Sequence, residues 1–258
     1  MYSESFEAAS NAAAKKVNLL KNNPFGYVLL SLLAGMYIGF GILLAFTIGS
    51  QMGTSPVANL VKGLIFGVAL SLVVIPGAEL FTGNNFVMGA GLLKKKVSVG
   101  QAFSLWAVCW LGNLVGAALL AWMYVNSGLD LPVVAAVFTK AAAAKMAAPA
   151  LQLFLRGILC NILVCLAVWS GFQTKNDAAK LIMVFWCLLA FFSTGFEHSV
   201  ANMTTFVVAL LSPAKAAGSV SVGGMFYNLL WVTLGNMVGG IFFVAFPYWI
   251  GAKATEKK

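Results

Sequence analysis

The sequence predicts an all-α polytopic membrane protein, with six transmembrane helices arranged as two inverted three-helix repeats. Of its 258 residues, 61% are hydrophobic and 9% are charged, and the mean hydropathy is +0.92, which no ordinary soluble domain approaches. Six apolar segments each exceed the roughly 20 residues needed to cross a bilayer. Two of these segments, the second and the fifth, are interrupted by polar breaks that resemble one another.

The chain begins with an amphipathic segment and continues with the six spans, all in a single transmembrane domain over 1–258. Apolar residues of the segment 1–23 recur at helical spacing on one face: Phe6, Ala9, Ala13, Val17 and Leu20. We expect this helix to lie on the membrane surface. The spans are expected at 25–50, 57–92 (broken), 99–125, 149–172, 179–210 (broken) and 225–250.

The lysines divide unevenly between the two sides that six spans define. One side holds Lys15, Lys16, Lys21, Lys94, Lys95, Lys96, Lys175, Lys180, Lys253, Lys257 and Lys258, whereas the other holds Lys62, Lys140, Lys145 and Lys215. The positive-inside rule then predicts that both termini are cytoplasmic, in a multi-pass protein of the inner (plasma) membrane. Topology therefore explains the formal charge of +9 better than binding to nucleic acid does, and no nucleic-acid partner is expected.

The two polar breaks lie at 77–84 (GAELFTGN) and 195–202 (GFEHSVAN), so that Gly, Glu and Asn recur at the same offsets. Pro76 removes a backbone donor, and Gly77 and Gly195 relax the helix. A carboxylate and an imidazole at membrane depth are costly and mark a path for something polar. Paired broken helices in corresponding halves indicate a substrate site near the bilayer midplane.

The repeat extends beyond the breaks, since the third span carries 112–116 (GNLVG) and the sixth carries 235–240 (GNMVGG). Three spans is an odd number, so the two halves must cross the membrane in opposite directions. Glu79 and Glu197 are expected to accept hydrogen bonds from amides freed at the breaks, as helix caps do. The asparagines of both halves are expected to bridge helices, and Asn236 also to line a pore: Asn84, Asn202, Asn113 and Asn236.

The titratable residues of the spans do not suit an enzyme or a redox protein. The cysteines lie inside apolar spans without a CxxC spacing, and the chain has one histidine: Cys109, Cys160, Cys165, Cys187 and His198. This set predicts neither a metal nor a cofactor, and it lacks the paired histidines that a haem would require. In a purely structural or signalling membrane protein, the buried charges at the breaks would be costly without any return.

Four strings of this sequence resemble the formate/nitrite transporter family, and the resemblance covers essentially the whole chain. Residues 77–83 (GAELFTG) are similar to the family's first signature, in the break of helix 2. Residues 157–167 (GILCNILVCLA) are similar to its second signature, in helix 4. Residues 195–203 (GFEHSVANM) resemble the break in helix 5, and 235–240 resemble helix 6.

This resemblance implies a homopentamer of aquaporin-like protomers in the lipid bilayer, each a channel domain with its own hydrophobic pore. The implied substrates are small monovalent anions of weak acids, namely hydrosulfide, formate and nitrite, protonated transiently in the pore. The chain is compatible with the hydrosulfide-channel branch, although the residues do not rank the three anions. A channel for neutral solutes such as water or glycerol is the alternative, but the chain lacks the Asn-Pro-Ala pair of aquaporins.

The same resemblance assigns a substrate pathway. It implies that His198 stands at the pore centre and that Thr82, in the other break, faces it. Apolar residues would narrow the pore on either side: Leu80, Leu70, Phe66 and Phe191. Further positions match pore-facing residues of helix 4 and a lysine of the outer vestibule: Asn161, Val164 and Lys145.

Overall fold

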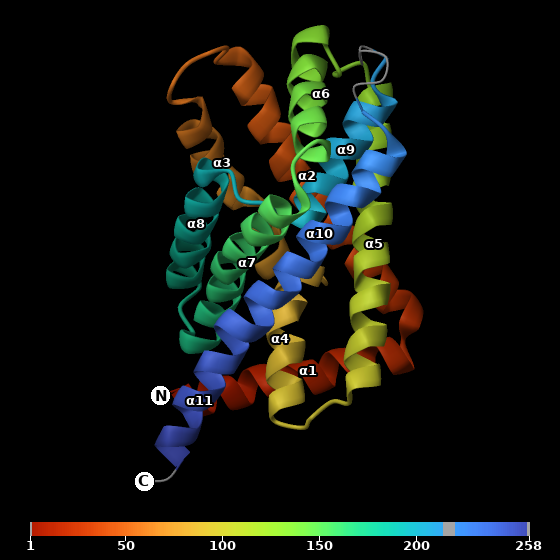
Figure 1. Ribbon diagram of the computed structural model, residues 1–258. Helices are drawn as coiled ribbons and strands as arrows, with labels where there is room; N and C mark the ends of the chain where they lie inside the picture. Colours follow the sequence, from red (N-terminus) through yellow and green to blue (C-terminus); the bar gives the residue numbers. More distant parts are fainter. Residues whose placement is uncertain (1, 214–219, 257–258) are drawn as a thin grey trace.

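The computed structural model describes residues 2–213 and 220–256, and in this part of the chain every regular element is helical (Figure 1). The elements are α1 (Tyr2–Asn22), α2 (Pro24–Gln51), α3 (Ala58–Val74), α4 (Phe81–Leu93), α5 (Val99–Asn126), α6 (Pro132–Met146), α7 (Ala150–Gln173), α8 (Asp177–Thr194), α9 (Ser199–Leu211), α10 (Val222–Gly240), the π-helical η1 (Ile241–Ala245) and α11 (Phe246–Glu256). Lys215, Lys257 and Lys258, which the topology prediction used, lie outside the described residues.

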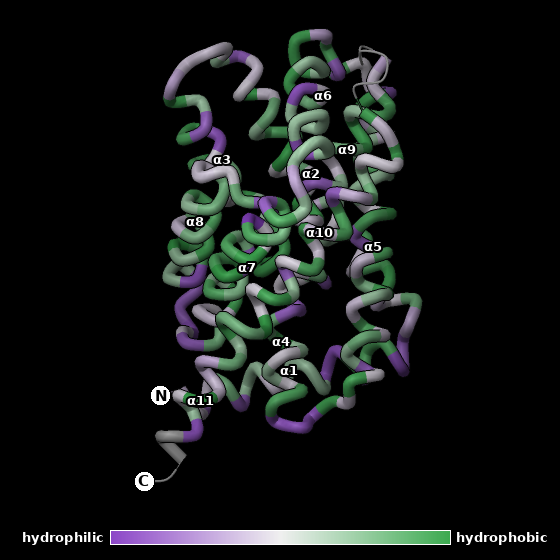
Figure 2. The backbone as a smooth tube through the Cα atoms, in the orientation of Figure 1, coloured by the Kyte–Doolittle hydropathy of each residue, from purple (hydrophilic) through white to green (hydrophobic). Residues whose placement is uncertain are grey.

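Five of the described helices are long and apolar enough to cross a membrane. They are α2, α5, α7, α8 and the continuous helix Val222–Lys253 that α10, η1 and α11 form. The remaining predicted span, 57–92, consists of the two shorter helices α3 and α4. The hydrophobic residues form a band along these helices, whereas the connection between α4 and α5 is polar (Figure 2). The all-α polytopic class is therefore confirmed.

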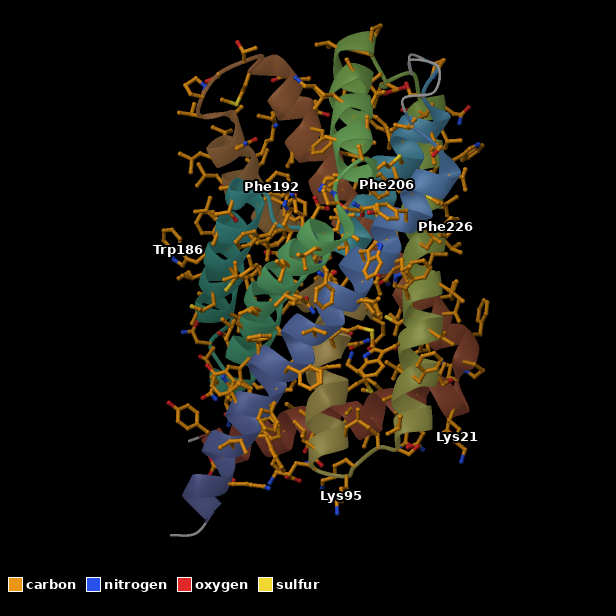
Figure 3. All side chains as sticks on the ribbon, in the orientation of Figure 1. Lys21, Lys95, Trp186, Phe192, Phe206 and Phe226 are labelled. Carbon is orange, nitrogen blue, oxygen red and sulfur yellow. The ribbon has the colours of Figure 1, made fainter. Side chains whose placement is uncertain are left out.

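The outer wall carries large apolar side chains that project away from the bundle. Trp186 and Phe226 are 57% and 48% exposed and point outward in Figure 3, whereas Phe206 is fully buried inside. Exposed aromatic and aliphatic side chains on this scale suit contact with lipid rather than with water. Lys21 and Lys95 project at the end of the bundle where both termini lie (Figure 3).

The first helix, α1, runs across that same end of the bundle (Figure 1). Its apolar face is buried through Phe6, Ala9, Ala13 and Val17, while Lys15 on the opposite face and Lys21 in the last turn are exposed. Asn23 then caps α2, since its Oδ1 accepts a hydrogen bond from the N–H of Gly26 at 3.0 Å. The amphipathic pattern thus places a horizontal helix beneath the spans.

Each break follows a glycine in the left-handed region of backbone space. Gly77 has φ +89° after Pro76, and Gly195 has φ +78° at the end of α8. A residue with a side chain would be strained at both positions. The chain continues in extended form, through Leu80 into α4 and through His198 into α9.

The two halves pack in the same manner. Helix α2 lies against α5, and helix α7 lies against α10. At Gly116 of α5 an added Cβ would overlap the carbonyl oxygen of Leu32, and at Gly239 of α10 it would overlap that of Ile158. These backbones therefore approach each other as closely as small residues allow, at equivalent points of the repeat.

Helix α6 was not predicted from the sequence. It spans Pro132–Met146, between the two halves, with Pro132 in its first turn. Its buried residues include Phe138, whose ring lies 4.6 Å from that of Phe46 between centroids. In the second half, α6 occupies the place in the chain order that α1 occupies in the first, because each precedes the half's first span.

Candidate functional site

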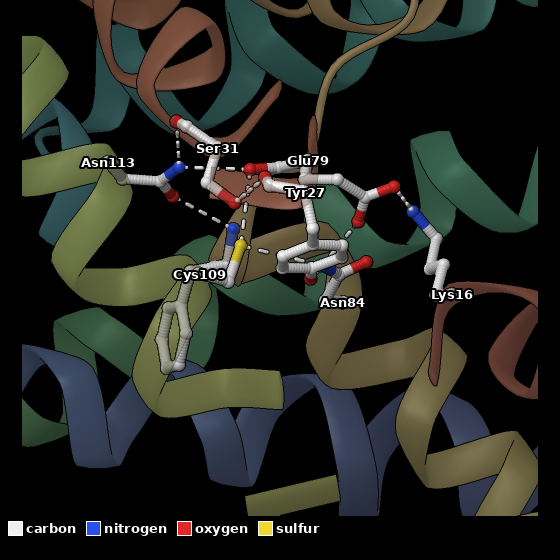
Figure 4. Close-up of polar contacts among 8 residues, drawn as sticks. Lys16, Tyr27, Ser31, Glu79, Asn84, Cys109 and Asn113 are labelled. Atoms are coloured by element: carbon white, nitrogen blue, oxygen red, sulfur yellow. Dashed lines mark hydrogen bonds and ion pairs between the residues drawn. The ribbon is translucent and has the colours of Figure 1, made fainter. Parts of the chain in front are cut away.

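A single asparagine holds the first break together. The side-chain amide of Asn113 donates to the carbonyl oxygens of Ser31, at 2.7 Å, and Glu79, at 2.9 Å. Its Oδ1 accepts a hydrogen bond from the N–H of Phe81, at 2.9 Å (Figure 4). Asn113 is fully buried, and this one side chain satisfies two backbone groups that the break frees, on Glu79 and Phe81, while it also binds the carbonyl of Ser31 in α2.

Asn236 repeats the arrangement in the second half. Its amide donates to the carbonyl oxygens of Gly157, at 2.8 Å, and Glu197, at 3.0 Å, and its Oδ1 accepts from the N–H of Ser199 at 3.0 Å. The sequence predicted that Glu79 and Glu197 accept hydrogen bonds from the backbone amides freed at the breaks. The structure corrects this, because the side-chain oxygens of Asn113 and Asn236 accept from the N–H groups at the start of α4 and α9. An asparagine suits this task since it offers donors and an acceptor together.

The two glutamates instead bind lysine and asparagine side chains. Glu79 accepts from Lys16 Nζ at 2.6 Å and from Asn84 Nδ2 at 3.0 Å (Figure 4). In the same way, Glu197 accepts from Lys145 Nζ at 2.8 Å and from Asn202 Nδ2 at 2.6 Å. The two lysines come from α1 and α6, the helices that precede each half. Each carboxylate is thus buried beside a cation.

His198 and Thr82 meet between the two breaks. The imidazole Nε2 lies 2.9 Å from Thr82 Oγ1, and both side chains are buried. The other ring nitrogen, Nδ1, accepts from the N–H of Ala201 at 3.0 Å and so caps α9. Since Nδ1 is an acceptor, we assign the ring proton to Nε2, and the imidazole then donates to the threonine hydroxyl.

Three cavities follow one another along the axis of the bundle. An outer cavity of about 190 Å³ includes Lys145, Phe191 and His198 in its wall. A central chamber of about 10 Å³ shares Phe191 and His198 with the outer cavity. An inner cavity of about 250 Å³ shares Leu70 and Leu80 with the central chamber. The chamber has room for roughly one water molecule, so it is a constriction between two wider mouths.

The wall of the central chamber is apolar except for the imidazole. The residues around it are Ile38, Phe66, Leu70, Leu80, Val164, Leu188, Phe191 and His198. Phe191 lies against His198 with an interplanar angle of 14°, and the ring of Phe66 meets that of Phe191 edge-on at 5.7 Å between centroids. Six of the residues assigned to the pathway from sequence therefore line this chamber. Thr82 does not line it but is hydrogen-bonded to His198, which does.

Asn161 and Asn236 lie behind this wall rather than on it. The amide of Asn161 donates to the carbonyl oxygens of Thr82, at 3.2 Å, and Asn236, at 2.6 Å. Both residues are fully buried, and neither lines any of the three cavities. The side-chain amides of both asparagines donate their hydrogen bonds to backbone carbonyls near the broken helices. The expectation that these two asparagines face the pore is therefore corrected.

Sequence reasoning did not assign Lys16 or Lys62 to the site. Lys16 lines the inner cavity and pairs with Glu79, and Lys62 lines the outer cavity. The first could have been suspected from the repeat, since Lys16 and Lys145 each precede a half that contains a Gly-x-Glu break. Among the described residues, no group of three or more His, Cys, Asp and Glu side chains is placed to hold a metal ion.

Comparison with known proteins gives a match over nearly the whole chain. The family model described as "Formate/nitrite transporter" matches residues 3–250. The nitrite transporter NirC of Escherichia coli is 43% identical over 100% of this chain and 95% of that protein. A probable formate transporter of Methanothermobacter thermautotrophicus is 37% identical, over 93% of this chain and 94% of its own length.

Two solved structures share the fold. One, described as an FNT family ion channel, superposes with a TM-score of 0.91 at 42% identity, covering 96% of this chain and 98% of that one. The other, described as a pentameric formate channel with formate bound, has a TM-score of 0.80 at 29% identity, covering 89% and 98%. The arrangement of broken helices described above therefore occurs in known channels.

Proposed function

Because this chain belongs to the formate/nitrite transporter family, we propose that it conducts small monovalent anions of weak acids through the three cavities described above. The relatives reported above are named as transporters and channels, so the chain is a transporter rather than an enzyme. Nitrite, formate and hydrosulfide are the proposed substrates. The names of the relatives support nitrite and formate, and the small central chamber supports hydrosulfide as well.

The observation that carries this proposal is the contact between His198 and Thr82 inside an otherwise apolar constriction. A bare anion entering such a space at low dielectric would meet a cost on the order of tens of kcal/mol. Taking up a proton costs roughly 1.4 kcal/mol for each unit by which the acid's pKa lies below the ambient pH. Weak acids therefore cross most cheaply as neutral molecules, whereas chloride is excluded.

The hydrogen bonds of His198 support a particular role in that step. A doubly protonated ring would point an N–H at the N–H of Ala201 and break the cap of α9. We therefore infer that His198 stays neutral and orients the hydroxyl of Thr82, which keeps its own proton for the substrate. The proton that neutralises the anion then comes from the aqueous phase through water in the adjoining cavity, and it returns to the aqueous phase when the acid dissociates on the other side. No stationary positive charge in the constriction traps the substrate.

We propose that the functional unit is a homopentamer in the inner membrane, with both termini in the cytoplasm. The pentameric relative supports the assembly, and the concentration of lysines near α1 and the connection between α4 and α5 supports the orientation. The cavity with Lys145 then opens to the outside. In this arrangement, Lys145 lies in the wall of the entrance, paired with Glu197, and the bilayer surrounds the apolar outer wall of the bundle.

Uptake into proteoliposomes tests the proposal. We expect the purified protein to take up nitrite, formate and hydrosulfide faster as the outside pH falls, because a neutral species crosses the constriction. Each anion should compete with the other two, and chloride should not compete. Osmotic swelling in glycerol, measured on the same vesicles, tests the neutral-solute alternative. Rapid swelling without any uptake of the three anions would overturn the proposed function.

A further inference from the structure

The outer cavity contains two lysines whose charges are balanced differently. Lys145 Nζ lies 2.8 Å from the carboxylate of Glu197, which is only 3% exposed, so this pair is neutral as a unit. Lys62 Nζ instead contacts the side-chain oxygen of Asn59 at 3.5 Å and lies 6.0 Å from the ring centroid of Phe46. Lys62 belongs to no ion pair among the residues that the structure describes. It is therefore a source of uncompensated positive charge in this cavity.

Lys62 is the first of three residues that line one face of α3 and extend from the outer cavity into the constriction. Lys62, Phe66 and Leu70 follow one another at four-residue spacing along α3, and residues at that spacing share one helix face. Lys62 lines the outer cavity, Phe66 the central chamber, and Leu70 both the chamber and the inner cavity. Along the axis of α3, the backbone of Lys62 thus lies about 6 Å, or roughly one helical turn, from that of Phe66, the first aromatic residue of the constriction.

The neighbouring helix is shaped to receive this side chain. A Cβ at Gly49 of α2 would overlap Cε of Lys62, so the absence of a side chain there makes room for the lysine stem. Asn59 lies one turn before Lys62 on α3 and uses its oxygen toward the ammonium group. Its amide N–H groups then remain as donors at the same place.

In the inner cavity, by contrast, the charge of each lysine is compensated by a carboxylate. The two lysines, Lys16 and Lys180, are both paired, with Glu79 at 2.6 Å and with Asp177 at 3.0 Å. The two breaks have equivalent ion pairs, Lys16–Glu79 and Lys145–Glu197. Lys62 has no equivalent in the inner cavity, whose lysines are both paired.

We propose that Lys62, together with the amide of Asn59, forms an anion subsite in the outer cavity that recruits the substrate before it reaches the constriction. The site takes a small monovalent anion, which the ammonium and amide groups bind through hydrogen bonds. This inference rests on the proposed function and adds the residue that sets apparent affinity from the outer side. Lys145, neutralised by Glu197, contributes mainly to the structure of the second break.

Initial rates of nitrite uptake test this subsite, with right-side-out proteoliposomes at one pH and a series of nitrite concentrations. Lys62→Gln keeps the length and polarity of the side chain but removes its charge. We expect its KM to rise on the order of three- to tenfold, with Vmax nearly unchanged, as one unit charge acting across a water-rich cavity would produce. The rise should shrink at high ionic strength, and Lys62→Arg should retain the low KM.

Lys140→Gln is the matched control, since Lys140 lies on the exposed face of α6 and does not line the cavity. We expect its KM to stay that of the wild type. A second variant, Gly49→Ala, keeps the charge but displaces the lysine stem, and its KM should rise as well. Wild-type uptake with an unchanged KM in Lys62→Gln would overturn the subsite alone. Absence of uptake by the wild type would overturn the proposed function together with it.

Discussion

His198 has two separate duties, and they depend on different ring nitrogens. Nδ1 caps helix α9 through the N–H of Ala201, and Nε2 contacts Thr82 across the break between the two halves. The first contact supports local stability, and the second belongs to the substrate route that we propose. Because one ring serves both, a substitution that removes the ring changes stability and transport together unless the cap is restored.

Asparagine at position 198 separates these duties, because it is among the best N-cap residues. We expect His198→Asn to retain most of the thermal stability and to take up nitrite more slowly, because the hydroxyl of Thr82 is no longer oriented by the imidazole. His198→Phe should lose both stability and uptake rate, with about 0.5–2 kcal/mol of destabilisation from the missing cap. Thermal unfolding in detergent and initial rates of nitrite uptake measure the two effects. Wild-type uptake rates in both variants would contradict the role of the imidazole in the proposed route.

At the scale of elements, the breaks exist because asparagines replace the missing backbone partners. Asn113 and Asn236 each bind one carbonyl and one N–H of the break, and one carbonyl of a helix that packs against it. The extended residues before α4 and α9 are therefore held as firmly as helix would be. This rigidity keeps Thr82 and His198 at hydrogen-bonding distance without help from a ligand.

Replacing either anchor by leucine should destabilise the protein substantially. Asn113→Leu and Asn236→Leu each remove the partner of one break N–H and one break carbonyl, at about 1–3 kcal/mol for each buried group left unpaired. Asn85→Leu is a matched control, because Asn85 is fully buried on α4 and, within the residues that the structure describes, neither of its side-chain polar atoms has a hydrogen-bond partner. We expect a lower midpoint of thermal unfolding for the two anchors and an equal or higher one for Asn85→Leu. Equal midpoints for all three would contradict the anchoring role.

The sequence predicted the elements better than it predicted their contacts. Pro76, Gly77 and Gly195 were sufficient to locate both breaks, since these residues act through their own backbone. Helix α6 was missed because its alanine-rich segment is less apolar than a span and lies in a connection. The partner of each break glutamate was missed as well, because Lys16 and Lys145 lie 63 and 52 residues from the carboxylates that they bind.

The same limit applies to the pathway residues. The resemblance to the family assigned six residues that surround one chamber, although only Leu80, Val164 and His198 belong to the similar strings. Asn161 belongs to the same string as Val164 but turns toward Thr82 and Asn236. Which of two neighbouring faces of α7 meets the chamber depends on the packing of α4 and α10, which no local pattern encodes.

At the scale of the whole molecule, the orientation in the membrane follows from charge. The four cysteines are buried, so single cysteines added at the surface can be labelled without background. We expect Lys140→Cys to react with a membrane-impermeant maleimide in intact cells. Lys95→Cys, at the end where the termini lie, should react only after the membrane is opened (Figure 3). The opposite pattern of labelling would reverse the topology.

The equivalence of Asn113 and Asn236 has a consequence for the direction of flow. Because the two breaks are anchored by the same hydrogen bonds, we expect them to present similar barriers to both compartments under the proposed function. Net flux of the neutral acid would then follow the concentration and pH gradients between the compartments. A difference between the inward and outward rates would trace back to side chains that the two halves do not share.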